Sequence, residues 1–258
     1  MNLQLDGKTA LVTGSTAGIG LAIATALAKE GAAVIVNGRT QERVAKAVQI
    51  SGAAHGIAAD LGTEEGAHAV ITRFPTLDIL VNNLGIFEPK PFEQIPDDDW
   101  RRFFEVNVLS GVRLSRHYLG AMKRNNWGRI IFISSESALQ IPVEMIHYGM
   151  TKTAQLAISR GLAETTAGTA VTVNAVLPGP TESEGVIGFV ERLAAEKGVK
   201  RHELEKEFFA KARPSSILQR FATPDEVAAV VAFVCSPLAS AINGAAVRAD
   251  GGVIRSIA

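Results

Sequence analysis

Residues 9–20 read TALVTGSTAGIG, an apolar run followed at once by three glycines in a Gly-x-x-x-Gly-x-Gly spacing. Such a run is typical of a buried strand, and the apolar residues at every third or fourth position from Ile19 to Glu30 are typical of a helix. Gly14 allows a tight turn, while Gly18 and Gly20 let the backbone approach a pyrophosphate and the helix pack on the strand. The stretch therefore predicts a strand, a turn and a helix that bind a dinucleotide, although a glycine-rich turn that binds nothing has the same residues.

The rest of the chain repeats this alternation of apolar runs and helical patterns. Apolar residues recur at helical spacing in Gln41 to Ile50 and Trp100 to Lys123. Strands that are apolar throughout and alternate with helices are typical of a parallel sheet with helices on both faces. We therefore predict an α/β, doubly wound fold in a single domain over residues 1–258, with ligands outside the carboxyl ends of the strands. The further apolar runs are residues 32–38, 56–60, 77–83, 128–135, 169–179 and 244–252.

Composition and charge exclude several classes of protein. The 258 residues carry 26 basic and 26 acidic side chains, so the electrostatic attraction that draws a protein to nucleic acid is absent. The longest apolar stretches, such as residues 228–235, fall well short of the roughly 20 residues of a membrane-spanning helix. One cysteine cannot form an internal disulfide, the five histidines are scattered, and no basic and apolar leader opens the chain. These features predict a soluble cytoplasmic protein with no metal site, no nucleic-acid partner and no membrane partner.

Further motifs follow the glycine turn in a fixed order. They are NNLG at residues 82–85, Asn107, the pair Ser134 and Ser135, YGMTK at residues 148–152, and LPGP at residues 177–180. With this order and this glycine spacing, the chain resembles the short-chain dehydrogenases/reductases from about Asp6 to Gly252, nearly its whole length. The resemblance implies a single-domain Rossmann fold of about seven parallel strands, a nicotinamide cofactor, and a homotetramer or homodimer.

The resemblance also implies a catalytic group of four residues. In it Tyr148 is the acid/base, Lys152 lowers the pKa of Tyr148 and binds the nicotinamide ribose, and Ser135 polarises the substrate oxygen. The backbone carbonyl of Asn107 helps to hold a water that links the lysine to solvent. Tyr148 and Lys152 are four positions apart in a helical pattern, which places them on one helix face, and a nearby cation lowers the pKa of a phenol. Without the other motifs, the same pair would be a solvated helix face.

The end of the second predicted strand, VIVNGRT at residues 34–40, indicates which cofactor is bound. Gly38 stands where NAD-dependent relatives usually have an aspartate, and Arg39 can donate two hydrogen bonds to a phosphate. We therefore predict NADP(H) in preference to NAD(H), with the hydroxyl of Ser15 as a second phosphate contact. The alternative is that Arg39 stacks on the adenine or faces solvent.

The resemblance supplies the remaining cofactor contacts. Asp60 matches the position that contacts the adenine amino group, although an aspartate before a turn is also common for local reasons. Thr181 would contact the nicotinamide carboxamide, a task that Ser183 would share. The full set of predicted cofactor contacts is Gly14, Ser15, Thr16, Gly18, Ile19, Gly20, Arg39, Asp60, Leu61, Asn83, Gly85, Tyr148, Lys152, Pro178, Gly179 and Thr181.

Residues 181–216 follow the sixth predicted strand at the cofactor end, where relatives have their substrate loop. Their charges have both signs, which argues against a nucleic-acid arm. We predict a helical lid that closes over nicotinamide and substrate, and the alternative is an amphipathic hairpin packed permanently on the domain. The apolar residues recur at helical spacing on either side of a glycine that separates two short helices: Val190 and Leu193, then Gly198, then Leu204, Phe208 and Phe209.

These features predict an NADP(H)-dependent oxidoreductase that interconverts a carbonyl and a secondary alcohol in a small-molecule substrate, with a 3-oxoacyl thioester as one candidate. A catalytically idle NADP(H)-binding sensor or interaction protein on the same fold is an alternative, although such proteins commonly lack the tyrosine or the lysine. A sugar-nucleotide epimerase or dehydratase is a third interpretation, which the glycine spacing disfavours. Further pocket candidates are Glu136, Leu139, Ile141, Val143 and His147.

Overall fold

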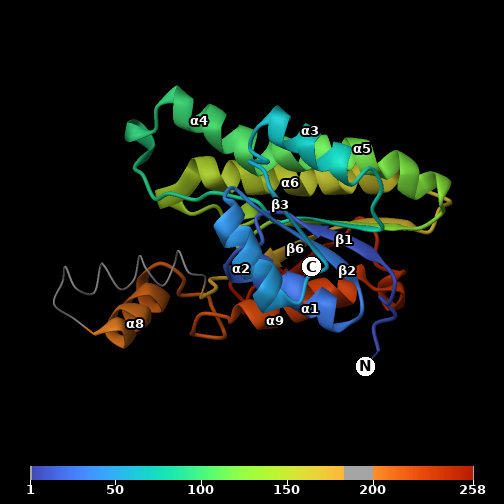
Figure 1. Cartoon of the computed structure of the whole chain (residues 1–258). Coiled ribbons are helices and arrows are strands. Elements are labelled where there is room, and N and C mark those ends of the chain that lie inside the picture. The colour runs from blue at the N-terminus through green and yellow to red at the C-terminus, as the bar shows by residue number, and fades with distance from the viewer. Residues whose placement is uncertain (1, 183–199, 258) are drawn as a thin grey trace.

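Seven parallel strands form one sheet in the computed structural model, which describes residues 2–182 and 200–257 (Figure 1). Their order is β3-β2-β1-β4-β5-β6-β7, and every neighbouring pair is parallel. The predicted α/β, doubly wound fold is confirmed. The strands are β1 (Thr9–Val12), β2 (Ala33–Gly38), β3 (His55–Ala58), β4 (Ile79–Asn82), β5 (Gly128–Ile133), β6 (Val171–Pro178) and β7 (Ala246–Ala249).

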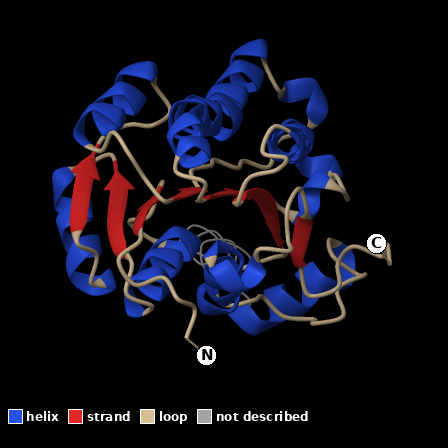
Figure 2. Cartoon of the chain, turned by 90° about the vertical axis from the view of Figure 1, so that its right-hand side faces the viewer, coloured by secondary structure: helices blue, strands red, loops and turns tan. Residues whose placement is uncertain are grey.

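Helices cover both faces of this sheet (Figures 1 and 2). One face carries α1 (Gly18–Lys29), α2 (Gln41–Ser51) and α9 (Pro224–Cys235). The other carries α3 (Glu64–Arg73), α4 (Asp97–Phe104), α5 (Ser110–Arg124) and α6 (Ile146–Glu164), while α8 (Arg201–Lys211) stands apart at the left of Figure 1. Short 3-10 turns occur at Phe92–Gln94, Glu136–Ala138, Val143–Met145 and Pro237–Ala239. None of the helices in the described ranges is long and apolar enough to cross a membrane.

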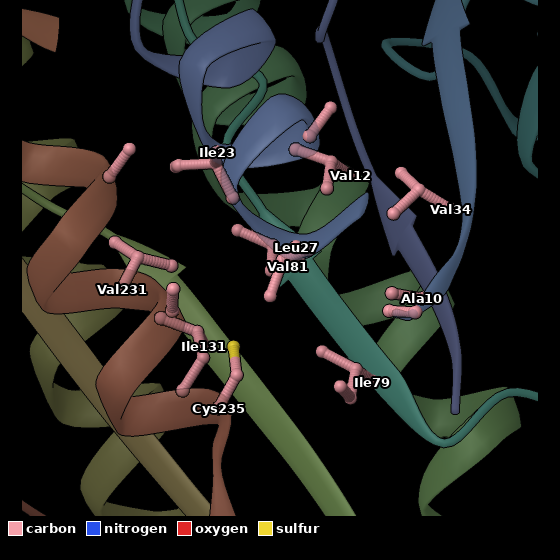
Figure 3. Packing of buried hydrophobic residues seen from close by; sticks show 14 of the residues in the cluster. Ala10, Val12, Ile23, Leu27, Val34, Ile79, Val81, Ile131, Val231 and Cys235 are labelled. Atoms are coloured by element: carbon pink, nitrogen blue, oxygen red, sulfur yellow. The ribbon is translucent and has the colours of Figure 1, made fainter. Parts of the chain in front are cut away.

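The strands contribute to two separate hydrophobic cores because successive strand residues point to opposite faces of the sheet. Each core has its own helices, so both faces of the five inner strands are buried, which explains why their sequences are mainly apolar. The edge strands β3 and β7 are partly exposed. Figure 3 shows the first core, in which Ala10, Val12, Val34 and Val81 meet Ile23 and Leu27 of α1 and Val231 and Cys235 of α9. In the second core Leu11, Ile35, Leu80 and Ile130 meet Val70 of α3 and Leu114 and Tyr118 of α5.

The helical pattern from Trp100 to Lys123 does not form one α-helix. Helix α4 ends at Phe104, a π-helical turn covers Glu105–Leu109, and α5 begins at Ser110. A π turn holds one extra residue, which the spacing of apolar residues does not reveal, and such turns are frequent at functional sites. This turn contains Asn107, whose side chain binds the main chain beyond β4: Oδ1 accepts from the Ile86 amide at 2.8 Å, and Nδ2 donates to the Ile86 carbonyl at 3.0 Å.

Candidate active site

A cavity of about 520 Å³ lies where the segments that leave β4, β5 and β6 meet the first turns of α6. A cavity of this size suits a small ligand or part of a larger one. Its wall brings together the predicted site residues Ile19, Asn83, Gly85, Ser135, Tyr148, Lys152, Pro178, Gly179 and Thr181. The other predicted site residues lie outside this wall: Gly14, Ser15, Thr16, Gly18, Gly20, Arg39, Asp60, Leu61 and Asn107.

The glycine turn between β1 and α1 requires its glycines. Gly14 has φ +59° and Gly18 has φ +54°, conformations that residues with a side chain rarely adopt. A Cβ at Gly20 would lie 2.5 Å from Asn83 Nδ2 and 2.6 Å from the Gly14 carbonyl oxygen. Asn83 in turn donates to the carbonyls of Thr13 at 2.9 Å and Gly14 at 3.1 Å, so the segment after β4 holds the turn in place.

Ser15 shapes this turn and does not present its hydroxyl to a ligand. Its side chain is fully buried, donates to the Val12 carbonyl at 2.7 Å and accepts from the Asn37 amide at 2.9 Å. Both hydrogen-bonding roles of the hydroxyl are filled within the protein. The predicted contact between this hydroxyl and a phosphate is therefore wrong for the described geometry.

Thr16 of the glycine turn crowds position 38, the last residue of β2. A Cβ at Gly38 would lie 2.4 Å from Thr16 Cγ2, so any side chain there requires Thr16 to move. Arg39, the next residue, is exposed. A carboxylate is thus absent and an exposed guanidinium is present at the end of β2.

Three further predicted cofactor contacts have local roles in the structure. Asp60 is exposed and its Oδ1 accepts from the Gly62 amide at 2.9 Å, which is the local turn contact considered above. The side chain of Leu61 is buried in the second core, so a ligand can meet only its main chain. Thr181 is buried and donates to the Gly179 carbonyl at 2.9 Å, whereas Ser183 lies outside the described residues.

Tyr148 and Ser135 share one part of the cavity wall, at the start of α6 and after β5. Burial raises the pKa of Tyr148 to about 12, and its contact with the Ser135 side chain opposes this rise. The Ser135 hydroxyl accepts from the Ser137 amide at 3.1 Å and lies 3.4 Å from Glu136 Oε2. Two hydroxyls therefore meet where a substrate oxygen could accept from both.

Lys152 lies on the same helix, with Nζ 5.5 Å from the centre of the Tyr148 ring. Its Nζ donates to the Ile133 carbonyl at 2.8 Å, and burial lowers its pKa to about 7. Burial of the phenol itself outweighs the contacts that lower its pKa, and the predicted lowering of this pKa by Lys152 stays a prediction.

Gln155 was not predicted from the sequence, yet it joins two of the predicted catalytic residues. This buried side chain donates to the Asn107 carbonyl at 2.6 Å, and its Oε1 lies 3.4 Å from Lys152 Nζ. Gln155 thus donates to the same Asn107 carbonyl that, by the resemblance, would help to hold a water. Its position three residues after Lys152, on the same helix face, was the available signal.

Of the pocket candidates between the serine and the tyrosine, Glu136 alone lines the cavity. Leu139, Ile141 and Val143 are exposed, and His147 is buried against Trp100 and Phe103. The predicted lid contributes Phe208, Ala212 and Arg213 to the wall, whereas Val190, Leu193 and Gly198 lie outside the described residues. No group of three or more potential metal ligands occurs in residues 2–182 and 200–257.

Known proteins resemble this chain over its whole length. A family model described as enoyl-(acyl carrier protein) reductase matches residues 14–254. The uncharacterized oxidoreductase YvaG of Bacillus subtilis is 54% identical over 263 residues, covering 100% of both chains. D-beta-hydroxybutyrate dehydrogenase of Cupriavidus necator is 37% identical, over 96% of this chain and 98% of its own. The crystal structure of L-sorbose reductase from Gluconobacter frateurii, complexed with NADPH and L-sorbose, superposes with a TM-score of 0.93 at 31% identity and covers 100% of both chains.

Proposed function

The chain belongs to the short-chain dehydrogenase/reductase family of oxidoreductases, and from that premise we propose that it uses NADP(H) to interconvert a carbonyl group and a secondary alcohol, with Tyr148 as acid/base. The observation that carries the proposal is that Tyr148, Ser135 and Lys152 line the same cavity as residues of the predicted cofactor turns. A catalytically idle sensor would need the cofactor side of this cavity but not the paired hydroxyls.

The residues at the strand ends fit a dinucleotide. Gly14, Gly18 and Gly20 bring the backbone close around the start of α1. No described side chain caps the N-terminus of α1, so its first amide groups are available to a phosphate. When bound, the nicotinamide supplies or accepts the hydride.

The residues of the chain itself handle the proton. Because burial raises the pKa of Tyr148 to about 12, the phenol keeps its proton at neutral pH, which supports a role as proton donor to a carbonyl oxygen. Ser135 donates a second hydrogen bond to that oxygen in this proposal. Lys152, with a pKa lowered to about 7, can gain or lose a proton near neutral pH beside the tyrosine.

The substrate is a small carbonyl or alcohol compound in this proposal. The 3-oxoacyl-[acyl-carrier-protein] reductase FabG of Aquifex aeolicus is 36% identical over 98% of this chain, which supports a 3-oxoacyl thioester as one candidate. A panel of ketones, 3-oxo esters and alcohols, followed by nicotinamide absorbance, would identify the accepted carbon skeleton.

The exchange of Tyr148 for phenylalanine tests the proposed reaction. Tyr148→Phe removes the proton donor but no phosphate contact, so we expect turnover to fall by about 1000-fold or more while NADPH still binds. Tyr118→Phe is the matched control, because Tyr118 is the other tyrosine and its hydroxyl donates to the Phe74 carbonyl, away from the cavity. The control should turn over at the wild-type rate, and an active Tyr148→Phe protein would contradict the assignment.

The preference for NADP(H) rests on the end of β2 in this proposal. Thr16 fills the space that an aspartate at position 38 would need, and the exposed Arg39 can meet a ribose phosphate. L-sorbose reductase, with a TM-score of 0.93, is described as an NADPH complex, which supports the same preference.

Arg39→Ala tests this preference. A charge-assisted hydrogen bond contributes about 1.5–3 kcal/mol, so NADPH affinity should fall by about 10-fold to 100-fold, and NADH affinity by less than about 3-fold. Fluorescence titration of both cofactors would measure the two changes, with Arg124→Ala, at the exposed end of α5, as control. Equal losses for the two cofactors would show that Arg39 does not bind the phosphate.

A further inference from the structure

A buried ion pair lies beside Tyr148 and Ser135 in the described wall of the cavity. Arg213 Nε donates to Glu136 Oε1 at 2.7 Å, and the two side chains are only 8% and 4% exposed. A second carboxylate, Glu144, lies 3.3 Å from Arg213 Nη1, and its side chain is 42% exposed. All three residues line the cavity, so this part of it holds two carboxylates and one guanidinium.

Arg213, the cation at this end of the wall, is already paired with carboxylates. Arg213 uses Nε for Glu136 and Nη1 for Glu144 and the Ala212 carbonyl at 2.8 Å. Lys152 donates to the Ile133 carbonyl and, in the proposed function, serves Tyr148 and the cofactor ribose. At the end of the cavity formed by Glu136, Glu144 and Arg213, a carboxylate on the substrate would therefore lose its water without gaining an unpaired cation, and it would face two negative charges and one positive charge.

The ion pair is close enough to act on the reacting oxygen. The charge of Glu136 raises the pKa of Tyr148, whereas the charge of Arg213 lowers it, so both charges are felt at the phenol. The wall also includes the apolar side chains of Phe87, Phe208 and Phe221. An uncharged carbonyl compound fits such surroundings, because it needs hydrogen bonds only at its oxygen.

We propose that the cavity accepts uncharged carbonyl compounds and rejects the corresponding free carboxylates, an inference that rests on the proposed function. The accepted compounds include ketones, 3-oxo esters and 3-oxo thioesters. Glu136 is the residue that determines this selection. Family membership does not decide the point. The name of D-beta-hydroxybutyrate dehydrogenase refers to a carboxylate, whereas L-sorbose, bound in the compared structure, is an uncharged ketose.

A pair of substrates that share the reacting ketone but differ in charge tests the inference. Ethyl 3-oxobutanoate and 3-oxobutanoate share the reacting ketone, and each is assayed with NADPH at pH 7.5. We expect kcat/KM for the ester to exceed that for the acid by about 10-fold or more, because a charge is repelled strongly in a cavity with little water. In Glu136→Gln the ratio of acid to ester should rise by about 10-fold, since the amide keeps the shape of the side chain and removes its charge.

Two further variants complete the experiment. Glu144→Gln leaves the buried pair intact and should raise the same ratio by about 3-fold, because solvent screens this half-exposed carboxylate. Glu65→Gln, on the exposed first turn of α3, changes the net charge equally and should leave the ratio unchanged. An acid reduced as readily as the ester by the wild type, or a ratio unmoved in Glu136→Gln, would overturn this inference alone. If the ester, the acid and every ketone of the panel fail to react, the proposed function itself falls, and the inference falls with it.

Discussion

Lys152 is a buried cation that forms no ion pair with a carboxylate in the described part of the chain. Its side chain is nearly inaccessible to solvent, and Nζ has only the Ile133 carbonyl and the Gln155 side chain within hydrogen-bonding distance. Burial lowers its pKa from the ordinary value of 10.5 to about 7. The folded state therefore holds this charge at an energetic cost that depends on pH.

Lys152→Met should stabilise the cofactor-free protein at neutral pH while it ends turnover. Between about pH 7 and pH 10.5 the unfolded wild-type chain binds a proton that the folded chain releases, so this group makes the free energy of unfolding rise with pH. The energetic cost of burying the charged lysine is therefore fully present at and below about pH 7, and Lys152→Met does not carry this cost. We expect its melting temperature to exceed that of the wild type by roughly 5 °C at pH 7, and the difference to shrink toward pH 10.

Thermal unfolding of the two proteins across this pH range would measure the effect. Lys46→Met, at an exposed position of α2, is the control and should show no pH-dependent difference. A Lys152→Met protein whose advantage is the same at pH 7 and pH 9.5 would show that the cost of the lysine is not electrostatic.

Single residues were predictable from sequence where their partners are local. Tyr148 and Lys152 stand at one helical spacing, and the structure places both in the cavity. Arg213 was not predicted, because its partner Glu136 lies 77 residues away in the chain. Ser15 was misinterpreted for a similar reason: the amide that its hydroxyl accepts from belongs to Asn37 on the neighbouring strand.

At the scale of elements, α8 is the helix that the structure describes within the predicted lid. Leu204 and Phe209 are buried, and Phe208 stacks on Phe221 with ring centres 5.2 Å apart. Arg213, just beyond the helix, adds the buried ion pair. These contacts hold α8 against the cavity, and whether it opens during turnover stays a prediction.

Trypsin cleavage within α8 tests whether the helix moves. Lys206 and Lys211 are exposed, and peptide mapping would follow cleavage after these two residues. A mobile lid should be cleaved about 10-fold more slowly when NADPH and a substrate alcohol are bound together, because closure protects the backbone. Arg213→Met, which breaks the ion pair, should be cleaved faster than the wild type in the absence of ligands. Equal rates with and without ligands in the wild type would favour a helix packed permanently on the domain.

Regular elements were easier to predict than irregular ones. The seven apolar runs all became strands. Burial on both faces makes the five inner strands mainly apolar, and the edge strands β3 and β7 follow the pattern although they are partly exposed. The break of the Trp100 to Lys123 pattern by a π turn was not predicted, since one inserted residue hardly changes the apolar spacing.

At the scale of the whole molecule, the reactivity of the Cys235 thiol can be used to measure how often the first core opens. It is the single cysteine of the chain, and its thiol is fully buried against the sheet at the end of α9 (Figure 3). Burial raises its pKa to about 12, so both access and ionisation are restricted in the native state.

A disulfide-type thiol reagent should therefore label Cys235 only when the core opens. We expect labelling of the native protein at pH 8 to be at least about 1000-fold slower than labelling of the protein in denaturant, where one equivalent reacts at once. Cofactor binding should slow it further in proportion to the stability gained. Complete labelling of the native protein within minutes would show that α9 separates from the sheet without global unfolding.

The global fold followed from patterns that extend along the whole chain, namely apolar strands in alternation with helices and glycines at the first turn. The homotetramer or homodimer implied by the resemblance stays a prediction, because subunit contacts depend on surfaces that no local pattern identifies.

The pairing of Glu136 with Arg213 also limits how this enzyme can be recombined with its relatives. A chimera that receives the substrate loop of a relative loses Arg213 and leaves the Glu136 carboxylate buried without its partner. Loss of one partner of a buried ion pair lowers the free energy of unfolding by about 3–5 kcal/mol. A chimera should therefore fold well only when residue 136 is exchanged together with the loop that supplies its partner.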